Sequence, residues 1–352
     1  PQAIRDTLES RITNDSVVIS AFGYKAEEIF NKVRQVQIVA CGTSYNAGLV
    51  AKYWLEDIAK IPCSVEVASE YRYRHPILLN NTLFVTLSQS GETADTVEAL
   101  KTAKKINDTI NTLCITNSAE SSLTRLSAST FLTHAGPEIG VASTKAFTTQ
   151  LVALALLTCS IGKIKKNINK KQEKGIVSGL KRLPGLINKA LHQETQIKKL
   201  AIRLKDKNSA LFLGRGTMHA IAMEGALKLK EVSYIHAEAY PAGELKHGPI
   251  ALIDKHMPVI AIAPNNELLG KLKSNLEEVK SRGSQMIVFE DENSKVKAMD
   301  AMEVISITSN LGRITAPIIF TIPLQLLSYH VAIIKDTDVD KPRNLAKSVT
   351  VE

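Results

Sequence analysis

One stretch of the sequence decides the fold: Leu83-Phe84-Val85-Thr86-Leu87-Ser88-Gln89-Ser90-Gly91-Glu92-Thr93. It reads as an apolar strand, a polar turn and the start of a helix. A helix N-terminus has unpaired N–H groups and a partial positive charge, so it favours a bound phosphate. Side-chain donors come from Ser88, Gln89, Ser90 and Thr93, and Gly91 lets the backbone approach closely. The stretch predicts a phosphate site; a cluster of helix-capping residues is the alternative interpretation.

The same order of strand, turn and helix occurs twice in the chain. Gly42 and Gly216 each follow an apolar strand, and they lie 174 residues apart. The same spacing pairs Ala68 with Ala242 without a gap. Strands that alternate with helices predict parallel βαβ units. We therefore predict an α/β protein with two tandem doubly wound, flavodoxin-like αβα subdomains.

The expected domain boundaries follow from this repeat. They are 1–165 for an N-terminal segment with the first subdomain, 166–205 for a helical connection, 206–335 for the second subdomain and 336–352 for a C-terminal tail.

The two copies differ where ligands bind, beyond the carboxyl ends of the strands. The second copy has the apolar, proline-containing turn Ile262–Glu267 in place of the serine turn. Thr43 and Ser44 follow the neighbouring strand of the first copy and add two hydroxyls. We expect the first copy alone to keep an anion site.

Composition limits the possible partners. The net charge of +9 suits an anionic partner, but the excess lies largely between Lys163 and Lys207. We interpret that segment as a solvated helical face, with a nucleic-acid patch as the alternative. Aromatic residues are only 5% of the chain, which argues against base stacking and hence against nucleic acid.

The four cysteines indicate a reducing, cytoplasmic-type compartment. Cys41, Cys63, Cys114 and Cys159 form no CxxC pair and no metal-ligand spacing with histidine, so we expect reduced core residues and no metal. The apolar run Leu151–Ile161 is shorter than the roughly 20 residues that span a bilayer, and no signal peptide is visible. We expect no membrane association.

Several motifs together carry a resemblance. They are Cys41–Ser44, Ser88–Thr93, Glu138-Ile139-Gly140-Val141-Ala142-Ser143-Thr144-Lys145, Glu224-Gly225-Ala226-Leu227-Lys228-Leu229-Lys230-Glu231, Ala242-Gly243-Glu244-Leu245-Lys246-His247-Gly248-Pro249 and the tail Asp340–Glu352. The first three resemble the sugar isomerase (SIS) domain. The whole set is similar to the C-terminal, isomerase half of the glucosamine-6-phosphate synthase family, the glutamine:fructose-6-phosphate transaminases (isomerizing).

The resemblance implies roles for four catalytic residues. Glu231 is the base that moves a proton between C1 and C2. Lys228 lies on the same helix face and supports the sugar hydroxyls or this proton transfer. His247 opens the sugar ring and comes from the neighbouring subunit. Lys347 forms a Schiff base with C2, which requires the tail to fold back over the phosphate site of the first copy. Without the resemblance, these residues read as a surface carboxylate, an ion pair, a solvated loop histidine and a tail lysine.

The resemblance also implies binding residues beyond the serine turn. Glu138, Val141 and Ser143 are expected along the sugar, and the Ala346 backbone is expected beside it. A plain connection between strand and helix is the alternative for the first three.

The implied function is enzymatic and belongs to amino sugar biosynthesis. The expected ligands are fructose 6-phosphate, glucosamine 6-phosphate and glucose 6-phosphate, with no cofactor. The expected partners are a second copy in a homodimer and a glutaminase domain, which we expect to be missing because the chain starts at Pro1. Other SIS-type phosphosugar isomerases or deglycases, and a non-catalytic sugar-phosphate sensor, remain alternatives.

Overall fold

The computed structural model describes residues 1–350 and divides into two compact units. The first comprises residues 1–182 and the C-terminal segment from Ala346 onward; the second is Leu183–Leu345. The boundary falls inside helix α8 (Lys170–Leu191), within the segment expected to be a helical connection. The last two residues of the predicted tail, Val351 and Glu352, lie outside the described residues.

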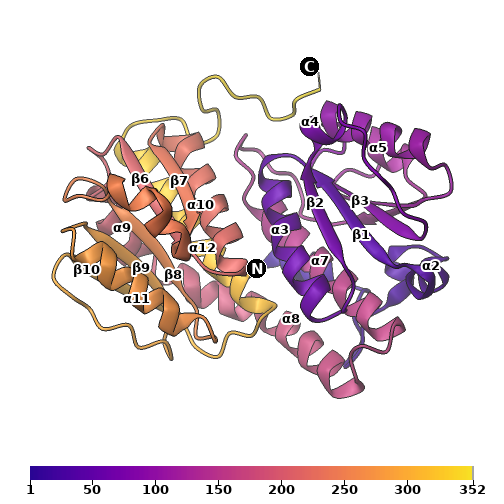
Figure 1. The fold of residues 1–352 in the computed structure, drawn as a ribbon, viewed down its shortest axis with the longest axis horizontal. Coiled ribbons are helices and arrows are strands. Elements are labelled where there is room, and N and C mark those ends of the chain that lie inside the picture. The colour runs from indigo at the N-terminus through magenta and orange to yellow at the C-terminus, as the bar shows by residue number, and fades with distance from the viewer. Residues whose placement is uncertain (351–352) are drawn as a thin grey trace. The chain divides into compact units, whose positions relative to one another are not determined.

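The first unit contains a parallel five-stranded sheet in the order β2-β1-β3-β4-β5 (Figure 1). Its strands are β1 (Gln35–Ala40), β2 (Cys63–Val67), β3 (Thr82–Ser88), β4 (Asn111–Thr116) and β5 (Ser129–Leu132). All seven residues of β3 are buried, as expected for a central parallel strand covered on both faces.

Helices cover both faces of this sheet. On one face α3 (Gly42–Asp57) packs against α7 (Lys145–Ile164), which also contacts α1 (Gln2–Leu8) and α2 (Ala26–Lys32). On the other face Phe84 and Cys114 pack against α4 (Ala68–Tyr71), α5 (Ala94–Ile106) and α6 (Ser122–Leu126). A short 3-10 helix, η1 (Ile19–Phe22), precedes α2.

The second unit repeats this sheet, with the order β10-β9-β8-β6-β7 (Figure 1). Its strands are β6 (Ser209–Gly214), β7 (His236–Pro241), β8 (Val259–Ala263), β9 (Met286–Asp291) and β10 (Met302–Thr308). Its helices are α9 (Glu194–Ile202), α10 (Thr217–Ser233), α11 (Leu269–Lys280) and α12 (Thr315–Ile334), with 3-10 helices η2 (Ala242–His247) and η3 (Pro249–Leu252). Here α10 and α12 pack together, and α11 lies on the core formed with η2.

The predicted fold and its internal repeat are both confirmed. Read from its edge, each sheet has the order 2-1-3-4-5 of the flavodoxin-like doubly wound fold. The first strands, Gln35–Ala40 and Ser209–Gly214, lie at the predicted spacing of 174 residues.

The cysteines are free, as predicted. Cys63, Cys114 and Cys159 are buried, and burial raises the pKa of each thiol to about 12. Cys41, just before α3, is only partly buried, so the expectation of a core residue holds less well there.

Within residues 1–350, two helices are long and apolar enough to cross a membrane by length and composition: α7 and α12. Their most apolar windows are 89% and 72% buried inside the protein. A helix in the core of an α/β domain can be equally long and apolar. The burial of α7 and α12 fits that role.

Candidate functional site

The serine turn lies at the carboxyl end of β3, as predicted, and its hydroxyls bond one another and the backbone. Ser88 Oγ lies 3.0 Å from Thr93 Oγ1 and accepts the Gly91 N–H at 3.0 Å. Ser90 Oγ accepts the Glu92 N–H at 3.1 Å. Thr93 is the N-cap of α5, but its side chain makes no capping hydrogen bond to the helix. The turn is therefore a folded polar loop above a helix N-terminus rather than a simple cap.

Gly91 is required by the shape of this turn. Its φ is +69°, a left-handed conformation that favours glycine. A Cβ atom on this residue would lie 2.0 Å from Ser121 Oγ. The carbonyl of Gln89 accepts the Asn117 N–H at 3.1 Å and so ties the turn to the end of β4.

Thr43 and Ser44 lie in the first turn of α3, which follows the neighbouring strand β1. The carboxyl ends of β1 and β3 therefore bring two helix N-termini to one edge of the sheet. Ser44 Oγ accepts a hydrogen bond at 3.0 Å from Nε2 of the buried Gln150. Gln150 Oε1 is buried and makes no hydrogen bond within the described residues.

The C-terminal tail lies on this turn. Ser348 Oγ is 3.1 Å from Ser90 Oγ, and the Val349 carbonyl accepts the first N–H of α5, from Ala94, at 3.0 Å. The predicted Schiff-base residue Lys347 directs its Nζ to the Gly140 carbonyl at 2.6 Å. The neighbouring Ala346 is exposed. Because Lys347 donates this hydrogen bond to the loop between β5 and α7, the tail lies against the first unit.

The loop of Glu138, Val141 and Ser143 joins β5 to α7, and all three residues are partly buried. Glu138 Oε1 accepts the Thr144 N–H at 2.6 Å and the Thr144 hydroxyl at 3.0 Å. Glu138 therefore holds the N-terminus of α7, where a carboxylate is favoured by the helix dipole. In the structure, the contacts of Glu138 are with the first residues of α7.

In the second unit, α10 carries a cluster of charged side chains. Lys228 Nζ lies 2.5 Å from Glu231 Oε2 and 3.5 Å from Glu224 Oε1. The expectation that Lys228 and Glu231 share a helix face is confirmed. Burial by itself lowers the pKa of the Lys228 ammonium, but the two carboxylates outweigh it and leave that pKa raised.

His247 is the last residue of η2 and is exposed. The sequence predicted a plain loop here, whereas the segment from Ala242 forms a 3-10 helix anchored by the buried Ala242 and Leu245. Its neighbour Lys246 forms an ion pair with Glu278 at 3.0 Å. The short helix therefore presents the imidazole to solvent on a fixed support.

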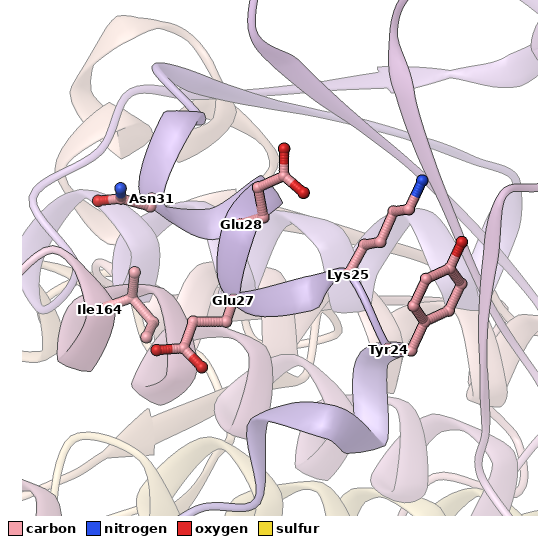
Figure 2. Close-up of a pocket in the computed structure, with 6 residues that line it drawn as sticks. All are labelled: Tyr24, Lys25, Glu27, Glu28, Asn31 and Ile164. Atoms are coloured by element: carbon pink, nitrogen blue, oxygen red, sulfur yellow. The ribbon is translucent and has the colours of Figure 1, made fainter.

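A separate hollow of about 740 Å³ lies beside α2 (Figure 2). It is lined by Tyr24, Lys25, Glu27, Glu28, Asn31 and Ile164. The first five precede the amino end of β1, and Ile164 ends α7, whose start follows the carboxyl end of β5. The hollow thus lies at the opposite end of the sheet from the serine turn, and its two acidic residues disfavour a phosphate.

Sequence reasoning missed several residues that contact the predicted ones, among them Gln150, Ser348 and Glu224. Gln150 interrupts the apolar sequence of α7, and a buried amide there was the available signal. Glu224 lies four residues before Lys228, a spacing that predicts an ion pair on a helix. The resemblance implied that the tail folds back over the phosphate site, but no pattern in the sequence indicated the particular contact of Ser348 with Ser90.

Comparison with known proteins agrees with this architecture. The SIS domain family matches residues 29–160 and 203–335, which correspond to the two sheets. The chain therefore belongs to the SIS domain family and contains two such domains.

More similar relatives indicate which group of SIS proteins the chain belongs to. The chain is 58% identical over its whole length to glutamine–fructose-6-phosphate aminotransferase [isomerizing] from Pseudomonas syringae and 57% identical to the protein of the same name from Aliivibrio fischeri. It spans 57% of the length of each. A solved structure of the C-terminal domain of glucosamine-fructose-6-phosphate aminotransferase from Francisella tularensis superposes with a TM-score of 0.94 at 52% identity, covering 97% of this chain and 95% of that domain. Within the SIS proteins, the chain corresponds to the C-terminal isomerase domain of the glutamine–fructose-6-phosphate aminotransferases.

Proposed function

We propose that this chain binds fructose 6-phosphate and converts it to an aldose phosphate, with the phosphate held by the serine turn. The observation that carries the proposal is the hydroxyl-rich turn between β3 and α5, with the tail residue Ser348 bonded to Ser90. Hydroxyls and helix N–H groups at one point form a site suited to a phosphate dianion. The α3 N-terminus, with Thr43 and Ser44, supplies further donors from the next strand.

The proposed chemistry assigns one task to each catalytic residue. His247 opens the sugar ring, and Lys347 condenses with the C2 carbonyl with loss of water. Glu231 takes a proton from one of C1 and C2 and returns it to the other, while Lys228 keeps its carboxylate in place. When ammonia displaces the lysine from C2 before the proton moves, the product is glucosamine 6-phosphate. Without ammonia, water releases the lysine and restores the C2 carbonyl, and the same proton transfer through an enediol gives glucose 6-phosphate. The ion pair of Lys228 and Glu231 at 2.5 Å supports this pairing of roles.

The proposal extends to partners that relatives of the full length suggest. Because the chain spans 57% of those relatives, we propose that a glutaminase domain supplies the ammonia. We further propose that the protein is a cytoplasmic homodimer in which His247 acts on the substrate of the partner subunit. Sedimentation of the chain with and without fructose 6-phosphate tests the dimer.

The phosphate site is tested by a double variant, Ser90→Ala with Thr93→Ala. Hydrogen bonds to a charged group contribute about 1.5–3 kcal/mol each. Losing two of them therefore weakens binding of fructose 6-phosphate by about 100-fold or more. Binding of unphosphorylated fructose should change little. Titration calorimetry with both sugars measures the difference.

The matched control is Asn265→Ala with Glu267→Ala, in the corresponding turn of the second unit. Both residues are exposed, and this variant should bind fructose 6-phosphate like the unmodified chain. Equal losses of the two sugars in the serine-turn variant would count against phosphate recognition there.

The Schiff-base role of Lys347 is tested by reduction with borohydride. The chain mixed with fructose 6-phosphate and borohydride should gain one sugar adduct, located at Lys347 by peptide mass spectrometry. Lys347→Ala should lose the adduct, while Lys341→Ala, an exposed lysine of the same tail, should keep it. Equal labelling of the Lys347→Ala variant would contradict the assignment.

A further inference from the structure

A buried amide of α7 points out of its own helix. Gln150 is 2% exposed and lies in the part of α7 that is buried on all sides. Other buried polar side chains of this helix bond within it; the Thr158 hydroxyl, for example, donates to the Leu154 carbonyl at 2.8 Å. Gln150 instead donates from Nε2 to Ser44 Oγ at 3.0 Å. The amide therefore links α7 to the first turn of α3.

This amide is not explained by the stability of the fold. Gln150 Oε1 is buried and accepts no hydrogen bond from the described residues. A buried polar atom without a partner is unfavourable, because it has lost its hydrogen bonds to water. Leu151 and Leu154 are fully buried on the same helix, so apolar side chains pack well in this layer. An apolar residue at position 150 would therefore serve the fold at least as well.

The hydrogen bond from Gln150 determines how the Ser44 hydroxyl can be used. A serine hydroxyl has one hydrogen to donate and two lone pairs that accept. Because Ser44 Oγ accepts from Gln150, its own hydrogen is left for another acceptor, and none is found among residues 1–350. The first turn of α3 also favours an anion through its free N–H groups. The amide thus turns Ser44 into a donor at a place where an anion would be bound.

We propose that Gln150 is a positioning residue of the phosphate site, which directs the Ser44 hydroxyl as a donor to the phosphate of fructose 6-phosphate. This inference rests on the proposed function, in which Ser44 supplies one of the donors. Gln150 is buried behind Ser44 and does not itself contact the sugar, so its whole effect on the ligand passes through that hydroxyl.

The test is Gln150→Met, which removes the amide and keeps an unbranched side chain of similar length. Loss of a directed donor to a charged group should weaken binding of fructose 6-phosphate by about 5- to 30-fold in titration calorimetry. Binding of unphosphorylated fructose should change by less than about two-fold. In the isomerisation assay, KM should rise while kcat changes little, because the phosphate lies away from the reacting carbons.

Thermal unfolding separates this role from a structural one. Because Gln150→Met removes an unpartnered buried oxygen, the melting temperature of the ligand-free variant should stay the same or rise. A lower melting temperature with equal losses for the two sugars, or a variant that does not fold, would contradict the inference. The matched control is Thr158→Val, which removes a buried hydrogen bond from the same helix and should leave both affinities unchanged.

A double-mutant cycle with Ser44→Ala tests the route of the effect. If Gln150 acts through Ser44, adding Gln150→Met to Ser44→Ala should weaken binding of fructose 6-phosphate by less than a further two-fold. Losses that multiply would show that Gln150 acts independently, and the inference would be wrong.

The unmodified chain distinguishes failure of this inference from failure of the proposed function. If it binds fructose 6-phosphate no better than fructose, the proposed function fails and this inference fails with it. If it prefers fructose 6-phosphate and Gln150→Met keeps the full preference, only the role of Gln150 is wrong.

Discussion

The two units carry the same sheet but end their strands with different chemistry. In the first unit, β3 ends at Ser88, which pairs with Thr116 at the end of β4. In the second, β8 ends at Ala263, which pairs with Glu290 near the end of β9. The first edge therefore offers hydroxyls, and the second offers an apolar residue beside a carboxylate.

The carboxylates of the second edge serve the fold. Glu290 accepts the Val296 N–H, and Asp291 accepts the Asn293 and Leu311 N–H groups. They shape the loops after β9 and repel an anion at the place where the first unit gathers donors. The comparison teaches that duplicating a doubly wound scaffold duplicates the position of a site, while the ligand is set by the side chains at the strand ends.

We expect the largest effect from Gly91→Ala, which should abolish the difference in ligand binding between the two turns. The new Cβ would lie 2.0 Å from Ser121 Oγ in a backbone with φ of +69°. Relief of this overlap moves the turn and costs about 1–3 kcal/mol of stability in the first unit. We expect fructose 6-phosphate binding to become undetectable by calorimetry. We also expect the melting temperature to fall. Asn265→Ala, at the matching position of the exposed second turn, should leave both measurements unchanged.

A variant Gly91→Ala that binds fructose 6-phosphate as tightly as the unmodified chain would show that the turn does not hold the ligand.

A smaller effect, on thermal stability, is expected from Glu138→Gln. This variant concerns the N-terminus of α7, which differs from the N-terminus of α12 in how it is capped. Glu138 accepts from the N–H and hydroxyl of Thr144, whereas near the start of α12 the Thr315 hydroxyl accepts the Gly312 N–H. Glu138 also accepts the Ala146 N–H at 3.4 Å. Removing the charge weakens these hydrogen bonds and the interaction with the helix dipole, at a cost of about 1 kcal/mol. Thermal unfolding should show a lower melting temperature.

The exposed Glu120 offers the control for this change, because Glu120→Gln removes the same charge from the same unit. Equal melting temperatures for Glu138→Gln and Glu120→Gln would mean that the carboxylate does not stabilise α7.

The sequence predicted the fold because its signals are local. Apolar runs such as Leu83–Leu87 are buried as parallel strands, and glycine at positions 42 and 216 marks the same tight turn in both copies. The polar end of β3 and the shared face of Lys228 and Glu231 follow from neighbouring residues as well. These features require only strand and helix periodicity.

The resemblance implied that the tail folds back over the phosphate site, but the individual contacts between distant residues could not be predicted from the sequence. Ser348 and Ser90 are separated by 258 positions, and Lys347 and Gly140 by 207. The tail has no periodic pattern, and its path over the first unit depends on hydrogen bonds between residues far apart in the sequence. Likewise, the 3-10 helix η2, which ends at His247, depends on packing of Leu245 in the core of the second unit.

The smallest expected effect is on the number of ligands bound. A graft of Pro264→Ser, Asn265→Gly and Glu267→Thr gives the second turn the polar residues of the first. Glu290 and Asp291 remain at the end of β9, so like charge still opposes a phosphate there. Calorimetry should therefore find one fructose 6-phosphate per chain before and after the graft. A second bound sugar would show that the turn alone makes the site and that the strand-end carboxylates do not oppose it.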